Sequence, residues 1–236
     1  MNTTIIGIDS AVEDKNIGLF CITLENNNLK NVEIRNRKPF IKFEEQIKVW
    51  IENAKGRILL AVDTPMGYPK NFGEAIKKHQ AGGKIMLSEF PRRETDKNIK
   101  EKYGITPLDI ASNLISRTTY STLNRISSIG QFSLIWDNKF DKFGMIEVYP
   151  KATLIANSIK ENYKGNKSEN NQKRKEILEK LKQKYPLENC FCPKNENDFD
   201  ALICCLAGFD FIVGKSNNFP KNKENIVKKE GWIWVK

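Results

Sequence analysis

Four carboxylates stand where the sequence predicts the end of a buried strand or the start of a buried helix. Asp9 ends the first apolar run of the chain, Asp63 ends a later one, and Asp200 opens a nearly apolar stretch. Glu147, inside another apolar run, is a fourth candidate. A buried acid is costly unless its charge is stabilised, so several converging acids indicate a divalent cation. Mg²⁺ or Mn²⁺ prefers such hard oxygen ligands and can activate a water against a phosphodiester.

Each acid also has a purely structural interpretation. Asp9 and Asp63 precede polar or proline-containing turns and could belong to the turns alone. Asp200 lies in the predicted first turn of a helix, where the helix dipole favours a negative charge. Asp198, two residues earlier, fits a helix cap better than a metal ligand, and Glu147 could be neutralised by a neighbouring basic side chain. The order of the acids along the chain strengthens the catalytic interpretation.

The histidine and cysteine content leaves little material for other catalytic chemistry. His79 is the sole histidine, so zinc sites and Ser–His or Cys–His pairs have almost nothing to be built from. The chain has 5 cysteines, and Cys190 and Cys192 are spaced too closely for a zinc knuckle. An odd number of cysteines in a chain without a predicted leader indicates reduced thiols and a cytoplasmic protein.

Composition and charge narrow the class of protein. The chain has 236 residues, of which 39% are hydrophobic and 29% charged, which is typical of a folded domain rather than a disordered segment. No apolar run approaches the roughly 20 residues of a membrane span, and the start lacks a secretory pattern, so we expect neither membrane insertion nor secretion. The formal net charge of +10 favours a polyanionic partner such as DNA or RNA, although a Lys- and Asn-rich compositional bias would also produce it.

Apolar periodicity predicts an α/β fold in a single domain spanning residues 1–236. Residues 3–8 and 17–24 form a predicted hairpin, residues 29–35 add a third antiparallel strand, and a helix over 43–54 leads into a strand at 57–63. Residues 70–140 are predicted to be a largely helical insertion with a helix over 107–129. The remaining predicted elements are a fifth strand at 144–148, helices from 152, over 172–185 and over 199–213, and a short terminal strand at 231–235.

Four basic residues of the insertion are candidates for binding a phosphate backbone next to the acids. They are Arg92, Arg93, Lys97 and Arg117. In the alternative interpretation, Arg92 and Arg93 pair with nearby acids and are structural. The basic helix over 172–185 could also follow a nucleic acid, although a solvated helix face explains its lysines equally well.

Several segments resemble a prokaryotic family of unknown function whose members are described as predicted RNase H-like nucleases. The segments are Ile-Gly-Ile-Asp-Ser-Ala at 6–11, Ala-Val-Asp-Thr-Pro-Met-Gly-Tyr-Pro at 61–69, Ile-Glu-Val-Tyr-Pro-Lys-Ala at 146–152, and the stretch 198–208 around Asp200. The resemblance implies a ribonuclease H-like mixed five-stranded sheet flanked by helices. It also implies a metal-dependent nuclease with Asp9, Asp63 and Asp200 as Mg²⁺ or Mn²⁺ ligands and Glu147 as a fourth catalytic acid.

One departure from that pattern keeps a second function open. Resolvase-like members of the fold often carry a carboxylate three residues before the helix Asp, and here Asn197 stands at that position. The alternative is therefore a non-catalytic nucleic-acid-binding or scaffold protein with a degenerate site. A sugar-kinase-type phosphotransferase is disfavoured, because the residues after Asp9 and Asp63 lack the glycines that bring backbone amides to a phosphate.

Overall fold

The sheet and its helices are seen in a computed structural model that describes residues 2–84, 92–165, 167–187 and 190–236. The strands are β1 (Thr3–Asp9), β2 (Gly18–Glu25), β3 (Asn28–Ile34), β4 (Arg57–Asp63), β5 (Ser133–Leu134) and β6 (Phe143–Glu147). The helices are α1 (Phe43–Asn53), α2 (Lys70–Lys78), α3 (Glu94–Tyr103), α4 (Asn113–Ile129), α5 (Pro150–Ala156), α6 (Ser168–Lys182), α7 (Glu196–Ile212) and α8 (Glu224–Glu230). Two 3-10 turns, η1 (Asp14–Asn16) and η2 (Lys221–Lys223), complete the elements.

The strands form a mixed sheet in the order β3-β2-β1-β4-β6-β5. The first three strands form an antiparallel meander, whereas β4 and β6 run parallel to β1 and β5 runs parallel to β6. The α/β prediction is confirmed, but this sheet has six strands rather than five. The additional strand, β5, is 2 residues long and therefore too short to show an alternating pattern in the sequence.

The segment predicted as a terminal strand at 231–235 is not one. It makes a single parallel bridge, between Ile233 and Glu147, and the Trp234 amide donates to the Glu147 carbonyl at 2.9 Å. Glycine at 231 has a positive φ of 91°, which turns the chain into this position. The segment therefore lies alongside the end of β6 without extending the sheet.

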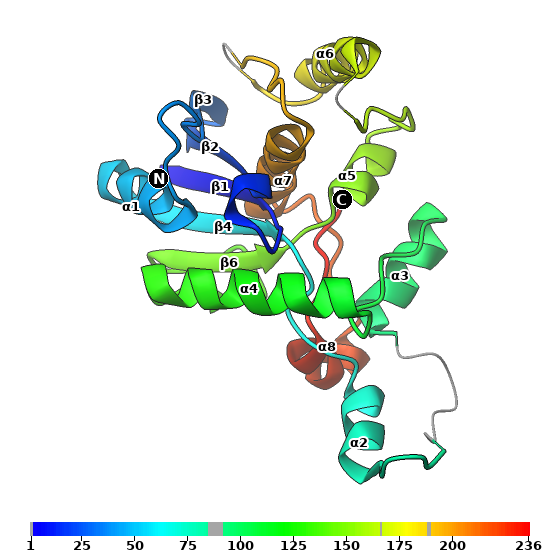
Figure 1. The fold of residues 1–236 in the computed structure, drawn as a ribbon. Helices are drawn as coiled ribbons and strands as arrows, with labels where there is room; N and C mark the ends of the chain where they lie inside the picture. The colour runs from blue at the N-terminus through cyan, green and yellow to red at the C-terminus, as the bar shows by residue number, and fades with distance from the viewer. Residues whose placement is uncertain (1, 85–91, 166, 188–189) are drawn as a thin grey trace.

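Helices cover both faces of the sheet (Figure 1). On β1, Ile5 belongs to the core cluster formed with α7, whereas the next residue, Ile6, belongs to the cluster formed with α1 and α4. On β4, Leu59 and Leu60 divide between the same two clusters. This explains why the central strands are continuous apolar runs, since both of their faces are buried.

Helix α7 approaches the sheet closely because the strand beneath it carries a glycine. A Cβ atom on Gly7 would lie 1.9 Å from the Ala201 carbonyl oxygen, a distance that no side chain tolerates. The Cys204 thiol contacts the Ile8 carbonyl at 3.6 Å. The start of α7 is therefore held directly over the carboxyl end of β1.

Helix α7 begins at Glu196, ahead of Asp198, which the sequence favoured as its cap. Its cap is Asn195, whose side-chain oxygen accepts a hydrogen bond from the Asn197 amide at 2.8 Å. The prediction was wrong because Asn195, Asn197 and Asp198 are all residue types that cap helices well. Asp200 consequently lies at the fifth residue of the helix rather than in its first turn.

The stretch 70–140 contains α2, α3, α4 and β5, and the helix predicted over 107–129 begins at Asn113. Within this stretch, α4 packs against the sheet, whereas α2 and α3 both contact α8 (Figure 1). The Glu230 carboxylate accepts hydrogen bonds from the amides of Lys70 at 2.7 Å and Glu94 at 2.9 Å. One side chain of α8 thus satisfies backbone donors at the starts of both α2 and α3.

The described part of the chain contains no helix of the length and apolar character needed to cross a bilayer. All five cysteine thiols are free, including the buried pair Cys204 and Cys205 on α7. The cysteines of α7 therefore serve as small core residues.

Candidate active site

Asp9 and Asp63 lie side by side at one edge of the sheet. They end the neighbouring parallel strands β1 and β4, and their Cα atoms are register partners. Register partners on adjacent strands are about 4.8 Å apart and point to the same side of the sheet. Both side chains are partly exposed, so the pair faces the space beyond the carboxyl ends of the strands.

Asp200 joins this pair from above, on helix α7. It lies one helical turn before Cys204, which contacts the end of β1, and only 1% of Asp200 is exposed. Burial raises the pKa of Asp9 well above its usual range, and the charges of Asp200 and Asp63 raise it further. Burial, with the charge of Asp200, likewise raises the pKa of Asp63 to about 8. The structure therefore brings three of the four predicted acids together.

The loop between α5 and α6 places two further residues in this cluster, Tyr163 and Lys164. The Tyr163 hydroxyl donates a hydrogen bond to Oδ1 of Asp200, and the Lys164 ammonium contacts Oδ2 of the same carboxylate. The charge of Lys164 opposes the rise in the pKa of both Asp9 and Asp63. Sequence reasoning missed both residues, because no motif or spacing indicates that this polar loop folds back onto α7.

A buried arginine of α6 holds the loop in place. The Arg174 guanidinium donates to the carbonyls of Tyr163 at 2.8 Å and Gly165 at 3.0 Å, and also to the Lys194 carbonyl at 3.0 Å. Its side chain is fully buried, unlike Lys173 and the other exposed lysines of the same helix. Arg174 is therefore a structural residue and not part of the solvated basic face.

Glu147 lies near the cluster but is already engaged by Arg93. The two guanidinium nitrogens of Arg93 donate to the two carboxylate oxygens at 2.8 and 2.7 Å, and the Met66 amide adds a bond at 3.0 Å. Arg93 also binds Asp96 through Nη2 at 2.8 Å. Burial raises the pKa of Glu147, and Arg93 opposes part of that rise.

Asp198, two residues before Asp200, forms an ion pair of its own with Arg37. The Arg37 guanidinium binds both of its oxygens, at 2.9 and 2.8 Å, and the Leu19 amide donates to it at 3.2 Å. Asp198 thus joins α7 to β2 as an ion-paired residue inside the helix, and it is not the helix cap that the sequence favoured.

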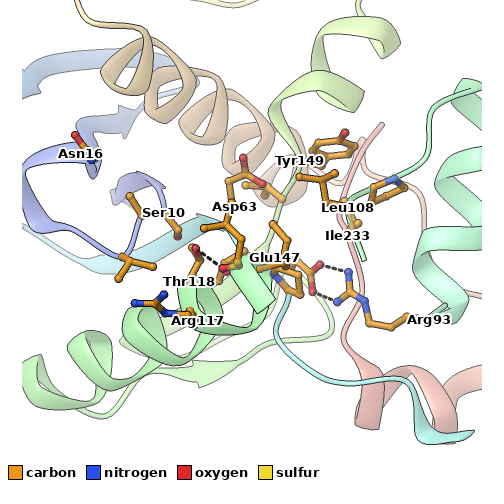
Figure 2. A pocket seen from close by; sticks show the side chains of 18 of the residues that line it. Ser10, Asn16, Asp63, Arg93, Leu108, Arg117, Thr118, Glu147, Tyr149 and Ile233 are labelled. Carbon is orange, nitrogen blue, oxygen red and sulfur yellow. Dashed lines mark hydrogen bonds and ion pairs between the residues drawn. The ribbon is translucent and has the colours of Figure 1, made fainter. Parts of the chain in front are cut away.

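A pocket of about 600 Å³ opens beside the aspartates (Figure 2). Asp63 and Glu147 line it together with Ser10 from the loop after β1 and Arg117 from α4. Much of its wall is apolar and includes Leu108 and Leu114, which are 70% and 67% exposed. The hydroxyl of Ser10, also in the wall, has no hydrogen-bond partner among the described residues. The pocket can therefore admit a ligand with both polar and apolar parts directly against Asp63.

The four basic residues predicted to bind substrate occupy different environments. Arg117 is exposed and lines both this pocket and a neighbouring hollow along α4. Arg93 also lines the pocket, but its guanidinium is already paired with Glu147 and Asp96. Lys97 is exposed and pairs with Glu94 at 3.4 Å, whereas Arg92 is partly exposed; neither lines the pocket.

The donor chemistry of the cluster fits a hard divalent cation. Asp9 and Asp63 supply carboxylate oxygens, and within the described ranges no hydrogen bond or ion pair engages either side chain. Asp200 is different, because Tyr163 and Lys164 engage both of its oxygens. The described residues include no group of three or more acidic, histidine or cysteine side chains arranged to hold a metal ion. The arrangement offers two available carboxylates and one that is already paired.

A comparison with protein families finds a match over residues 7–225 to the family described as "Protein of unknown function (DUF429)". The chain belongs to this family. The DUF429 match includes all four predicted acids as well as Lys164 and Arg174. Comparisons with curated proteins and with solved structures found no match. The function of this DUF429 chain must therefore be argued from the site itself.

Proposed function

We propose that the chain is a metal-dependent nuclease that hydrolyses phosphodiester bonds of DNA or RNA. The observation that carries this proposal is the meeting of Asp9, Asp63 and Asp200 at the carboxyl edge of the sheet, where the Lys164 ammonium pairs with Asp200 and leaves Asp9 and Asp63 available. Clustered carboxylates with raised pKa values are typical of functional sites, because a purely structural site gains nothing from their repulsion.

The proposal includes a ribonuclease H-like architecture for the domain, with the stretch 70–140 as its insertion. It is supported by the antiparallel meander of β1 to β3, by the helix that leads into β4, and by Asp63 at the end of that strand. A late helix carrying an acid over β1 completes the pattern that the sequence resemblance implies.

Each residue of the site has a definable part in this reaction. Asp9 and Asp63 would hold Mg²⁺ or Mn²⁺ beside the pocket. The bound ion would supply charge stabilisation to the phosphate and lower the pKa of a water. Asp200 orients Lys164 and Tyr163 beside the pair. Arg117, on the pocket wall, is placed to contact a phosphate of the substrate.

The direct test is cleavage of labelled single-stranded DNA, duplex DNA, RNA and RNA–DNA hybrid in Mg²⁺, Mn²⁺ or EDTA. We expect cutting of at least one of these substrates in the presence of metal and none in EDTA. Cutting that persists in EDTA would contradict a metal-dependent mechanism.

The second candidate is a nucleic-acid-binding protein without catalysis, and the pairing of Lys164 with Asp200 favours it. An ammonium group at the acid cluster could replace the metal permanently and leave a structural site. This function predicts binding of the same nucleic acids with equal affinity in Mg²⁺ and EDTA, and no cutting in either.

Replacement of Arg117 with alanine is expected to weaken substrate binding by about fivefold to tenfold, close to 1 kcal/mol, because an exposed guanidinium on the pocket wall is lost. The slope of log affinity against log salt concentration should decrease by the contribution of about one phosphate contact. Fluorescence anisotropy at several salt concentrations measures both effects. The matched control is Lys48→Ala, which removes an exposed charge from α1. Equal losses in the two variants would indicate a general charge effect instead of a contact at the pocket.

A further inference from the structure

Among the described residues, one cation, Lys164, lies in the acid cluster, and it contacts only one of the three aspartates. The Lys164 ammonium contacts Asp200, whose other oxygen accepts the Tyr163 hydroxyl. Over the described residues, the carboxylates of Asp9 and Asp63 take part in no hydrogen bond or ion pair. The cluster is therefore divided into a satisfied carboxylate and an available pair.

The position of Lys164 is built into the fold. Arg174, itself fully buried, binds the carbonyls of Tyr163 and Gly165, the two residues that flank Lys164. The Asn170 side chain also donates to the Lys164 carbonyl at 2.7 Å. The backbone of Lys164 is thus anchored before and after the residue, while 56% of its side chain remains exposed. The ammonium reaches Asp200 from the open side of the site.

We propose that Lys164 permanently takes the place of a second divalent ion, so that the site binds one Mg²⁺ or Mn²⁺ ion, held by Asp9 and Asp63. A second divalent ion at Asp200 would have to displace the ammonium and would be repelled by it at short range. The Tyr163 hydroxyl already occupies the other oxygen of that carboxylate. This inference rests on the proposed function and specifies how many metal ions that function uses.

Lys164 also differs from a metal ion in what it contributes to the site. It is a fixed single positive charge with N–H donors, which suits contact with a phosphate oxygen beside the single metal ion. Because Asp200 orients it, we assign Asp200 as a positioning residue for Lys164 rather than as a metal ligand. The site then has an acidic half formed by Asp9 and Asp63 and a basic half formed by Lys164.

The test is the stoichiometry of Mn²⁺ binding to the full chain, measured by electron paramagnetic resonance of the free ion and by calorimetry. The variants are Lys164→Met, which removes the charge, Lys164→Arg, which keeps it, and Lys160→Met, which removes an exposed lysine of the same loop. We expect one ion per chain in the wild type, Lys164→Arg and Lys160→Met, and two ions in Lys164→Met. Circular dichroism establishes that each variant is folded.

Each other outcome has a definite meaning. Two ions in the wild type, or a single ion in folded Lys164→Met, would overturn the inference and leave the nuclease proposal intact. No ion in the wild type or in any variant would overturn the metal-dependent function and the inference with it. The wild-type count alone tests the inference if Lys164→Met does not fold.

Discussion

Replacement of Asp63 with asparagine is expected to reduce metal-dependent cleavage by about 10³-fold without unfolding the chain. Asp63 ends β4 directly beside Asp9 and lines the pocket, so its loss removes one of two available carboxylates. Asparagine has nearly the same size, which preserves the packing at the strand end. Initial rates of cleavage measured against Mg²⁺ concentration would show the loss. The matched control, Asp141→Asn, changes an exposed aspartate and should leave the rate unaltered.

The same variant should be more stable than the wild type when metal is removed. Burial and the charge of Asp200 raise the pKa of Asp63 to about 8, so the folded chain holds this proton more tightly than the unfolded chain does. A raised carboxyl pKa means that stability falls as the pH rises from about 4 toward the folded pKa. The asparagine side chain of the variant does not titrate, and in EDTA at pH 8 we expect a gain of about 1 to 2 kcal/mol. Thermal unfolding of the wild type and the variant in EDTA measures this gain in stability. Unchanged cleavage together with unchanged stability would show that Asp63 is not part of the site.

Replacement of Arg93 with methionine is expected to destabilise the fold by about 3 to 5 kcal/mol. Arg93 is 1% exposed and neutralises both Glu147 and Asp96, so its loss leaves two carboxylates buried without their cation. Urea denaturation of the wild type and of Arg93→Met would measure the difference in the free energy of unfolding. The cleavage rate of Arg93→Met, measured under conditions in which this variant is folded, should fall much less than the rate of Asp63→Asn.

The control for Arg93 is another ion pair of the same length in a more exposed place. Arg125 contacts Glu44 at 2.8 Å, with about a quarter of each side chain exposed, and Arg125→Met should cost at most about 1 kcal/mol. A further variant, Arg93→Met with Glu147→Met, should recover part of the loss because it removes both charges of the pair. If Arg93→Met is as stable as Arg125→Met but loses substrate affinity, Arg93 binds substrate after all.

Much of the sheet was predictable because its central strands are short apolar runs. Asp9 and Asp63 could be placed at strand ends for the same reason, since each follows the last apolar residue of such a run. Their meeting could be expected only after β1 and β4 were assumed to be parallel neighbours. The register that aligns them is a property of the sheet and is not visible in either segment alone.

Contacts between distant parts of the chain account for what could not be predicted. Arg93 and Glu147 are separated by 54 residues, and each has several charged neighbours in sequence that are equally plausible partners. Lys164 contacts Asp200 from a loop that Arg174 holds in place, an arrangement of three segments that no local pattern encodes. The helices α2, α3 and α8 are only 9, 10 and 7 residues long, so each offers too few turns to establish an apolar period in the sequence.

The segment after α8 lies between β6 and α3, and this has a consequence for the order in which the site forms. The Ile233 amide donates to Thr95, and the Trp234 amide donates to the Glu147 carbonyl. Ile233 also lines the pocket. During synthesis, β1, β4 and β6 all leave the ribosome before this segment does, so the aspartates can meet while the pocket still lacks a wall. Contacts of such long sequence separation close late in folding. A nascent chain would therefore bring Asp9 and Asp63 together before it could enclose a substrate, whereas Asp200 joins them only when α7 packs over β1.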